Sequence, residues 1–301
     1  MNTALLQRSM IVLISGFALG HLCGQSLVDQ GATLQKLADE FSFTEGPTCD
    51  AMGNVYFTDQ PNNRILRWGN DSKLTTFMQP AGRANGMCFD TNGNLIACAE
   101  EKNELWSVAP DGKVTVIASE YGGKPFNGPN DVWIAPNGGL YFTDPFYRRA
   151  WGRYQQMPQD GQHVYYVTPD RKRIVRVIRD LKQPNGITGT PDGKRLFVAD
   201  IGAGRTWAYD VNPDGALTNK TLFCDLGSDG MTIDEWGNLY LTGKGITIFD
   251  KTGRKIEHID VPEPWTANVS FGGPDHRTLF ITASKSLYSI RLRVKGANPT
   301  K

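Results

Sequence analysis

The sequence predicts an all-β fold, a six-bladed β-propeller, and three observations support this prediction. Six similar segments follow one another along the chain, and each reads as a strand, a turn and a second strand. The segments begin 39 to 55 residues apart, a spacing typical of the four-stranded blades of a propeller. The 33 glycines and 17 prolines among 301 residues disfavour the long amphipathic helices that helical repeats of similar length require.

The six segments share a polar first residue, which we call the leader. The six leaders are Glu45, Asn85, Asn130, Asn185, Asp229 and Asn268. Further alternating strands fill the intervals between the segments. We expect residues 286–294 to pair with residues 34–43, because an open ring would leave strand edges exposed. Residues 27–301 are therefore predicted to form a single propeller domain.

The N-terminus has the pattern of a targeting segment. Arg8 precedes an apolar run over residues 10–22, and the small residues Gly24 and Ser26 follow it. We expect residues 1–26 to be a signal peptide, which predicts a secreted or periplasmic protein with no membrane span in the mature chain. The run of 13 residues is short for a spanning helix, although an uncleaved anchor is the alternative.

Charge and cysteine content narrow the classes of partner. The chain has 32 Lys and Arg against 31 Asp and Glu, so it lacks the positive field with which proteins attract nucleic acid. We therefore expect a small-molecule substrate and no nucleic-acid partner. Four cysteines follow the targeting segment without metal-site spacing, and free thiols and one disulfide are both compatible with them. These are Cys49, Cys88, Cys98 and Cys224.

All six leaders carry a side-chain oxygen, which is the most informative pattern in the sequence. Turn chemistry is the simpler explanation, because Asn-Gly and Asp-Gly are common in hairpins. However, each of the first five segments has a separate glycine for its own turn, such as Gly53 and Gly93. The innermost strands of a propeller converge on one axis, so the leaders are expected to form a ring of oxygens.

Such a ring predicts a bound cation, because gathered carboxylates repel one another and buried acceptors lose water. Glu45 and Asp229 supply two negative charges, and the asparagines supply neutral amide oxygens. Carboxylate and amide oxygens are ligands of a hard cation such as Ca²⁺ rather than of Zn²⁺.

The longest interval between segments contains an aromatic and basic stretch, residues 144–154. It includes Asp144, Tyr147 and Arg148. Long loops above a rigid scaffold commonly carry binding residues. We expect this stretch to form a lid or pocket wall and these three residues to contact substrate.

The ordered motifs resemble those of the gluconolactonase family that includes regucalcin, also called the senescence-marker-protein family. The matching motifs, which span essentially the whole mature chain, are Glu45-Gly46-Pro47, Pro129-Asn130-Asp131, Pro184-Asn185-Gly186, Asp229-Gly230-Met231 and Ser270-Phe271-Gly272-Gly273. The resemblance implies a six-bladed propeller with one axial divalent cation, usually Ca²⁺ and in some members Zn²⁺, Mn²⁺ or Mg²⁺. It implies that Glu45, Asn185 and Asp229 hold this cation and that Asn130 joins it or binds substrate. We also expect Asn85 to contact substrate.

One departure from the family affects the substrate. Sugar-lactone members resembling regucalcin carry an arginine two residues before the asparagine that matches Asn130, and this chain has Gly128 there. Arg148, Arg149 or Arg153 could replace that contact, or these arginines could be exposed and solvated.

The resemblance and the ring together predict a metal-dependent hydrolase that opens a lactone or related ester. The cation would polarise the carbonyl, and Asp229 would act as general base toward the attacking water. No Gly-x-Ser-x-Gly motif supports a covalent serine mechanism. Two alternatives remain, a phosphotriester or organophosphate hydrolase on the same scaffold and a non-catalytic binding propeller.

Overall fold

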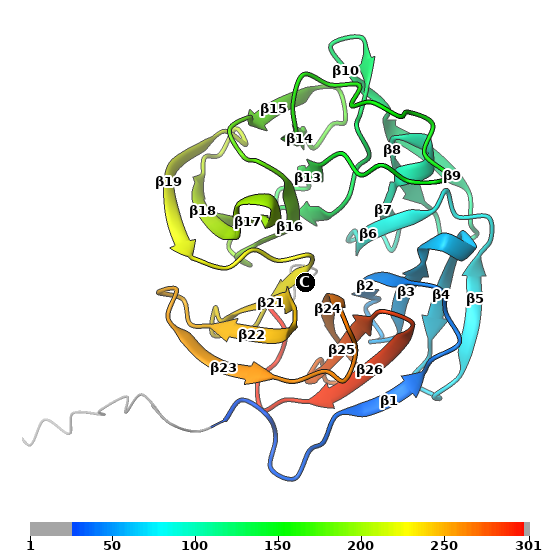
Figure 1. Cartoon of the computed structure of the whole chain (residues 1–301), viewed down its shortest axis with the longest axis vertical. Coiled ribbons are helices and arrows are strands. Elements are labelled where there is room, and N and C mark those ends of the chain that lie inside the picture. The colour runs from blue at the N-terminus through cyan, green and yellow to red at the C-terminus, as the bar shows by residue number, and fades with distance from the viewer. Residues whose placement is uncertain (1–25, 298–301) are drawn as a thin grey trace, which may run out of the picture.

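Six four-stranded antiparallel sheets surround a central axis in the computed structural model, which describes residues 26–297 (Figure 1). The first strand of each sheet lies nearest the axis, as the labels β2, β6, β16 and β24 show in Figure 1. The predicted six-bladed β-propeller is confirmed. The predicted signal peptide lies outside the described residues except for Ser26.

The strands of the first three blades follow chain order from the axis outward. The first blade contains β2 (Thr44–Cys49), β3 (Val55–Asp59), β4 (Arg64–Trp68) and β5 (Leu74–Met78). The second contains β6 (Ala84–Phe89), β7 (Leu95–Ala99), β8 (Glu104–Val108) and β9 (Val114–Ala118). The third contains β12 (Val132–Ile134), β13 (Leu140–Asp144), β14 (His163–Val167) and β15 (Ile174–Ile178).

The remaining three blades complete the ring. The fourth contains β16 (Pro184–Gly189), β17 (Arg195–Asp200), β18 (Arg205–Val211) and β19 (Leu217–Cys224). The fifth contains β20 (Met231–Ile233), β21 (Leu239–Gly243), β22 (Gly245–Phe249) and β23 (Lys255–Ile259). The sixth contains β24 (Thr266–Gly272), β25 (Thr278–Ala283), β26 (Ser286–Arg291) and, outermost, β1 (Gln35–Ala38).

The pairing of β1 with β26 closes the ring. Gln35 lies opposite Ser289 in this antiparallel pair, and an isolated bridge joins Val28 to Leu292. Figure 1 shows the N-terminal strand β1 beside the C-terminal strand β26. The predicted closure is confirmed, and it protects an edge that an open ring would expose.

Apolar side chains fill the spaces between blades and hold them in fixed rotation. Between the second and third blades, Ile96 and Leu105 pack with Phe142 and Tyr165, and all four are at most 1% exposed. The rings of Phe142 and Tyr165 are stacked with their centroids 5.4 Å apart. Because core packing of this kind tolerates little displacement, it fixes the positions of the strand ends around the axis.

In three of the blades, an aspartate at the end of the second strand binds the segment that leads into the innermost strand of the same blade. Asp144 ends β13, and its two oxygens accept the backbone N–H groups of Asn127 at 3.0 Å and Gly128 at 2.8 Å. Asp200, which ends β17, accepts two backbone N–H groups with both oxygens in the same way. Asp59, which ends β3, accepts two backbone N–H groups with Oδ1 alone. These contacts set where the entering segment, and hence the leader, lies.

Short elements complete the structure. A hairpin of β10 (Glu120–Tyr121) and β11 (Lys124–Pro125) precedes the third blade. Three 3-10 turns follow second strands at Gln60–Asn62, Glu100–Lys102 and Ile201–Ala203. All four cysteines of the described residues are free thiols, and none of the helices described there is long and apolar enough to cross a membrane.

Candidate functional site

The six leaders lie at the same end of the innermost strands. Glu45, Asn85, Asn185 and Asn268 belong to the innermost strands of their blades, whereas Asn130 and Asp229 lie two residues before β12 and β20. Asp229 is half-buried and the other five leaders are buried. The structure therefore brings the sequence-predicted oxygen-bearing residues to one end of the central channel.

The glycine that follows a leader allows neighbouring innermost strands to approach closely. A Cβ on Gly46, whose φ is +49°, would lie 1.9 Å from the backbone oxygen of Asn85. A Cβ on Gly230 would lie 1.9 Å from Cγ of Asn268. The leader-glycine pairs thus reflect the close approach of blades at the axis rather than the hairpin chemistry that was the simpler explanation.

A chain of hydrogen bonds joins four residues across the channel mouth. Asn185 donates from Nδ2 to Asp229 Oδ1 at 2.8 Å and to the Tyr147 hydroxyl oxygen at 2.8 Å. Trp265 donates its indole N–H to Asp229 Oδ2 at 2.6 Å. The carboxylate of Asp229 is therefore held by donors from the blades on both sides of it.

Glu45 is a buried carboxylate without a cationic partner. It is 3% exposed, and its carboxylate accepts one hydrogen bond, from the backbone N–H of Gly46 at 3.0 Å. Within the described residues it forms no ion pair. Burial raises the pKa of Glu45 well above its usual range, and the nearby charge of Asp229 raises it further.

Asp229 is subject to opposing effects. Loss of solvation raises the pKa of Asp229, whereas the hydrogen bonds from Trp265 and Asn185 lower it. The net pKa is above that of an ordinary aspartate, which makes the carboxylate a stronger base.

These two carboxylates fit a cation site. Each is destabilised in its charged form by burial, and a bound cation would remove that cost. No group of three His, Cys, Asp or Glu side chains within residues 26–297 has the arrangement of a metal site. A cation here would therefore need amide oxygens beside the carboxylates, and the leaders provide such oxygens, as hard cations require.

Two further leaders have unengaged side chains. Asn85 and Asn130 are each 3% exposed as whole residues, and their side-chain amides make no hydrogen bond with the described part of the chain. Their amide atoms are not among the fully buried unpaired polar atoms of residues 26–297, so these groups still face accessible space. Their position in the ring therefore leaves donors and acceptors free for a ligand.

The predicted lid residues differ in their placement. Tyr147 reaches the ring through its hydrogen bond with Asn185. Arg148 is exposed and makes no hydrogen bond or ion pair with any residue that the structure describes, whereas its neighbour Arg149 pairs with Glu100 at 2.7 Å. Asp144 is fully buried, and its carboxylate binds backbone N–H groups as in two other blades, so substrate contacts for Asp144 and Arg148 stay predictions.

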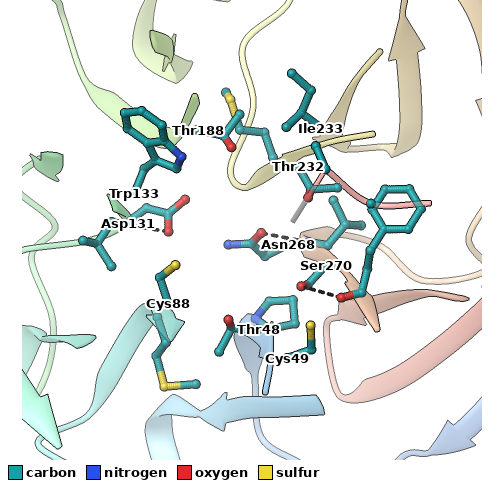
Figure 2. A pocket seen from close by; sticks show the side chains of 18 of the residues that line it. Thr48, Cys49, Cys88, Asp131, Trp133, Thr188, Thr232, Ile233, Asn268 and Ser270 are labelled. Carbon is teal, nitrogen blue, oxygen red and sulfur yellow. Dashed lines mark hydrogen bonds between the residues drawn. The ribbon is translucent and has the colours of Figure 1, made fainter. Parts of the chain in front are cut away.

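A cavity of about 130 Å³ lies in the channel on the far side of the ring (Figure 2). It is lined by residues further along the innermost strands, and the C-terminal Gly296 and Ala297 also line it. Figure 2 shows Asp131 and Asn268 around this space. Burial raises the pKa of Asp131 to about 7 although the backbone N–H groups of Val132 and Ile187 donate to its carboxylate.

Sequence reasoning missed three residues of the site. Trp265 lies three residues before a leader, a place where the six segments share no residue type, so the repeat carries no signal for it. Asp131 follows a leader directly. Glu100 follows the second strand of its blade, and its contact with Arg149 depends on a fold that brings together residues 49 positions apart.

Comparison with known proteins assigns this arrangement to a family. The family model of the SMP-30/gluconolactonase/LRE-like region matches residues 43–285. Gluconolactonase of Zymomonas mobilis is 29% identical over 304 residues, covering 90% of this chain and 84% of that protein. Regucalcin of Xenopus laevis is 24% identical over 293 residues, covering 88% and 96%.

Solved structures give the same result. A gluconolactonase from Xanthomonas campestris superposes with a TM-score of 0.83 at 28% identity and covers 88% of this chain and 91% of its own. Regucalcin of Agrobacterium tumefaciens, described as a calcium-binding protein, has a TM-score of 0.73 at 20% identity over 88% of this chain and 95% of its own. At that lower identity the likeness concerns the fold.

Proposed function

Because the chain belongs to the SMP-30/gluconolactonase/LRE-like family, we propose that it is a hydrolase that opens a lactone at the ring of leaders. The observation that carries the proposal is the pair Glu45 and Asp229, two carboxylates at one end of the channel, of which Asp229 lies close enough to raise the cost of ionising Glu45. Relatives named gluconolactonase support the reaction class.

We propose that Glu45, Asn185 and Asp229 hold one divalent cation, with Ca²⁺ preferred by the all-oxygen donors. When bound, such a cation supplies positive charge that stabilises negative charge developing on a carbonyl oxygen. Glu45 would serve as the anchor of the site, because its hydrogen bond comes only from the adjacent backbone.

Asp229 would take a proton from the attacking water. Water adds to the lactone carbonyl carbon, and the proton passes to the ring oxygen as the carbon–oxygen bond breaks, which yields the hydroxy acid. Trp265 and Asn185 hold the carboxylate in place, and each of its oxygens retains a lone pair for this transfer. The free amide groups of Asn85 and Asn130 would bind the substrate's oxygens.

The test is a pH-stat assay that measures hydrolysis of a panel of lactones, aryl esters and phosphotriesters, with and without a chelator. The proposal predicts lactone turnover that the chelator abolishes and added Ca²⁺ restores. Turnover of phosphotriesters with inert lactones would favour the alternative hydrolase. Failure of all three substrate classes together with absence of bound metal would favour a binding propeller.

We also propose that the protein is exported, on the basis of Arg8 and the apolar run over residues 10–22. Sequencing the N-terminus of the mature protein from a cell fractionation would test this. Cleavage near residue 26 is expected, and an intact N-terminus in the cytoplasmic fraction would contradict export.

A further inference from the structure

Arg149 is fixed by a fork of hydrogen bonds to a buried glutamate. Its Nε donates to Glu100 Oε1 at 2.7 Å, and its Nη2 donates to Glu100 Oε2 at 3.3 Å. The Glu100 side chain is 7% exposed and that of Arg149 is 27% exposed. Two-point pairing of a guanidinium with a carboxylate fixes orientation as well as distance.

Aromatic rings frame the same guanidinium. Its Cζ lies 4.8 Å from the centre of the Tyr147 ring and 5.7 Å from that of Trp151. Arg83 covers the Trp151 ring at 4.7 Å. Stacked and paired in this way, Arg149 loses little further freedom when it binds a ligand.

The guanidinium lies at the rim of the ring of leaders. The Tyr147 ring beneath it carries the hydroxyl that accepts a hydrogen bond from Asn185. The positive charge of Arg149 also lowers the pKa of both Glu45 and Asp229, which places it within electrostatic reach of the carboxylates. A substrate lying over Asp229 would therefore come close to Arg149.

One end of this guanidinium is uncommitted. Glu100 takes Nε and Nη2, and Nη1 makes no hydrogen bond with any residue from 26 to 297. The charge of Arg149 is balanced by Glu100, and Glu45 and Asp229 add negative charge nearby. Because Glu100 already balances the guanidinium, no net positive charge remains to hold an anionic substituent, and a neutral hydroxyl group is the better match for Nη1.

We propose that Arg149 is a specificity-determining residue whose Nη1 hydrogen-bonds a hydroxyl group of a polyhydroxylated lactone, and that Glu100 is the residue that positions it. This inference rests on the proposed lactonase function. A site whose polar group hydrogen-bonds a substrate hydroxyl discriminates against an analogue without that hydroxyl, because the polar group is then left unpaired.

The experiment compares kcat/KM for D-glucono-δ-lactone and δ-valerolactone, two six-membered lactones that differ in their hydroxyl groups. Arg149→Met should lower the ratio of kcat/KM for the hydroxylated lactone to that for δ-valerolactone by about 10- to 100-fold, because an altered charge near Glu45 and Asp229 affects both lactones alike whereas the hydroxyl contact affects only one. Arg149→Lys keeps the charge without the fork and should fall between wild type and Arg149→Met.

Glu100→Gln tests the positioning role. It leaves Arg149 in the chain but weakens the fork, so KM for the hydroxylated lactone should rise by about 3- to 10-fold with a smaller change in kcat. Arg205→Met is the matched control, since Arg205 is an exposed arginine that pairs with Asp225 at 3.5 Å away from the ring. It should leave both lactones unaffected.

The outcomes separate this inference from the proposed function. A wild-type protein inactive on both lactones would contradict the proposed function and with it the inference. If the wild type is active and Arg149→Met keeps the same preference for the hydroxylated lactone, the inference alone is overturned. This outcome includes the case in which both rates fall equally and the case in which neither falls. If circular dichroism shows that Arg149→Met does not fold, the ratio of kcat/KM for the two lactones in Arg149→Lys and Glu100→Gln tests the inference instead.

Discussion

Trp265 and Asp229 come from neighbouring blades, and the indole N–H of the first donates to Oδ2 of the second at 2.6 Å. Trp265 directly precedes β24, and Asp229 lies two residues before β20. A hydrogen bond to a carboxylate stabilises its charged form and therefore opposes the effect of burial on its pKa. Trp265 thus favours the ionised form of the proposed base.

Trp265→Phe should shift the pH dependence of activity. Without this donor, the effect of burial on the pKa of Asp229 is less opposed, so that pKa rises. As pH is lowered, activity that depends on the carboxylate is then lost at a higher pH than in wild type. The acid limb of kcat/KM should move up by about one pH unit, the equivalent of one hydrogen bond to a charged group. An acid limb at the wild-type position, measured at saturating Ca²⁺, would show that Trp265 does not tune the base.

Glu45→Gln should stabilise the metal-free protein at neutral pH. The pKa of Glu45 is raised in the folded state, so as pH rises above the ordinary pKa of glutamate the folded protein is destabilised relative to the unfolded chain, and this cost is complete above the raised pKa. Gln keeps the shape and removes the charge, and in chelator the melting temperature should rise by about 2–5 °C. As pH falls toward the ordinary pKa of glutamate, this difference from wild type should vanish.

The same variant should respond less to Ca²⁺. One of two negative charges at the site is lost, so the rise in melting temperature on adding Ca²⁺ should be smaller than in wild type. A variant that melts below wild type in chelator would contradict the cost assigned to the buried charge of Glu45, and one that gains as much from Ca²⁺ as wild type would contradict the anchoring role of Glu45.

Asp144→Asn should affect stability rather than catalysis. Asn offers one acceptor oxygen where Asp144 has two, so the backbone N–H of Asn127 or Gly128 loses its partner. We expect a loss of about 1–3 kcal/mol in the free energy of unfolding with kcat of the folded enzyme unchanged. Asp200→Asn, which alters the equivalent contacts in the fourth blade, should behave alike.

A drop in kcat in Asp144→Asn that Asp200→Asn does not share would instead support the substrate contact expected from the sequence. Chemical denaturation and initial rates on the same preparations distinguish the two results.

The fold was predictable because the repeat reports strand order and blade number directly. The ring of leaders followed, since equivalent positions of six blades must meet at the axis. The backbone contacts of Asp144 also have a signal in the repeat, because Asp59, Asp144 and Asp200 all end a second strand. The shared aspartate indicates a structural role that is common to these three blades.

The lid was less predictable because residues 144–154 have no periodicity to orient side chains. Arg148 and Arg149 are neighbours in one loop, and the expectation of a substrate contact at Arg148 rested on the composition and length of that loop alone. What distinguishes Arg149 is its contact with Glu100. Packing of the second blade against the third brings Glu100 Oε1 to 2.7 Å from Nε of Arg149. Trp265 likewise reaches Asp229 only through the packing of two blades.

The central claim is that Asp229 activates water, and Asp229→Asn at saturating Ca²⁺ tests it most directly. Asn keeps a side-chain oxygen in place but removes both the negative charge and the proton acceptor, and raising the Ca²⁺ concentration, with occupancy verified by titration, compensates for weaker binding alone. We expect kcat for lactone to fall by about 10²- to 10⁴-fold with the site filled, and the acid limb of the pH profile to disappear. A filled Asp229→Asn variant that turns over lactone within a few-fold of wild type would show that Asp229 is not the base.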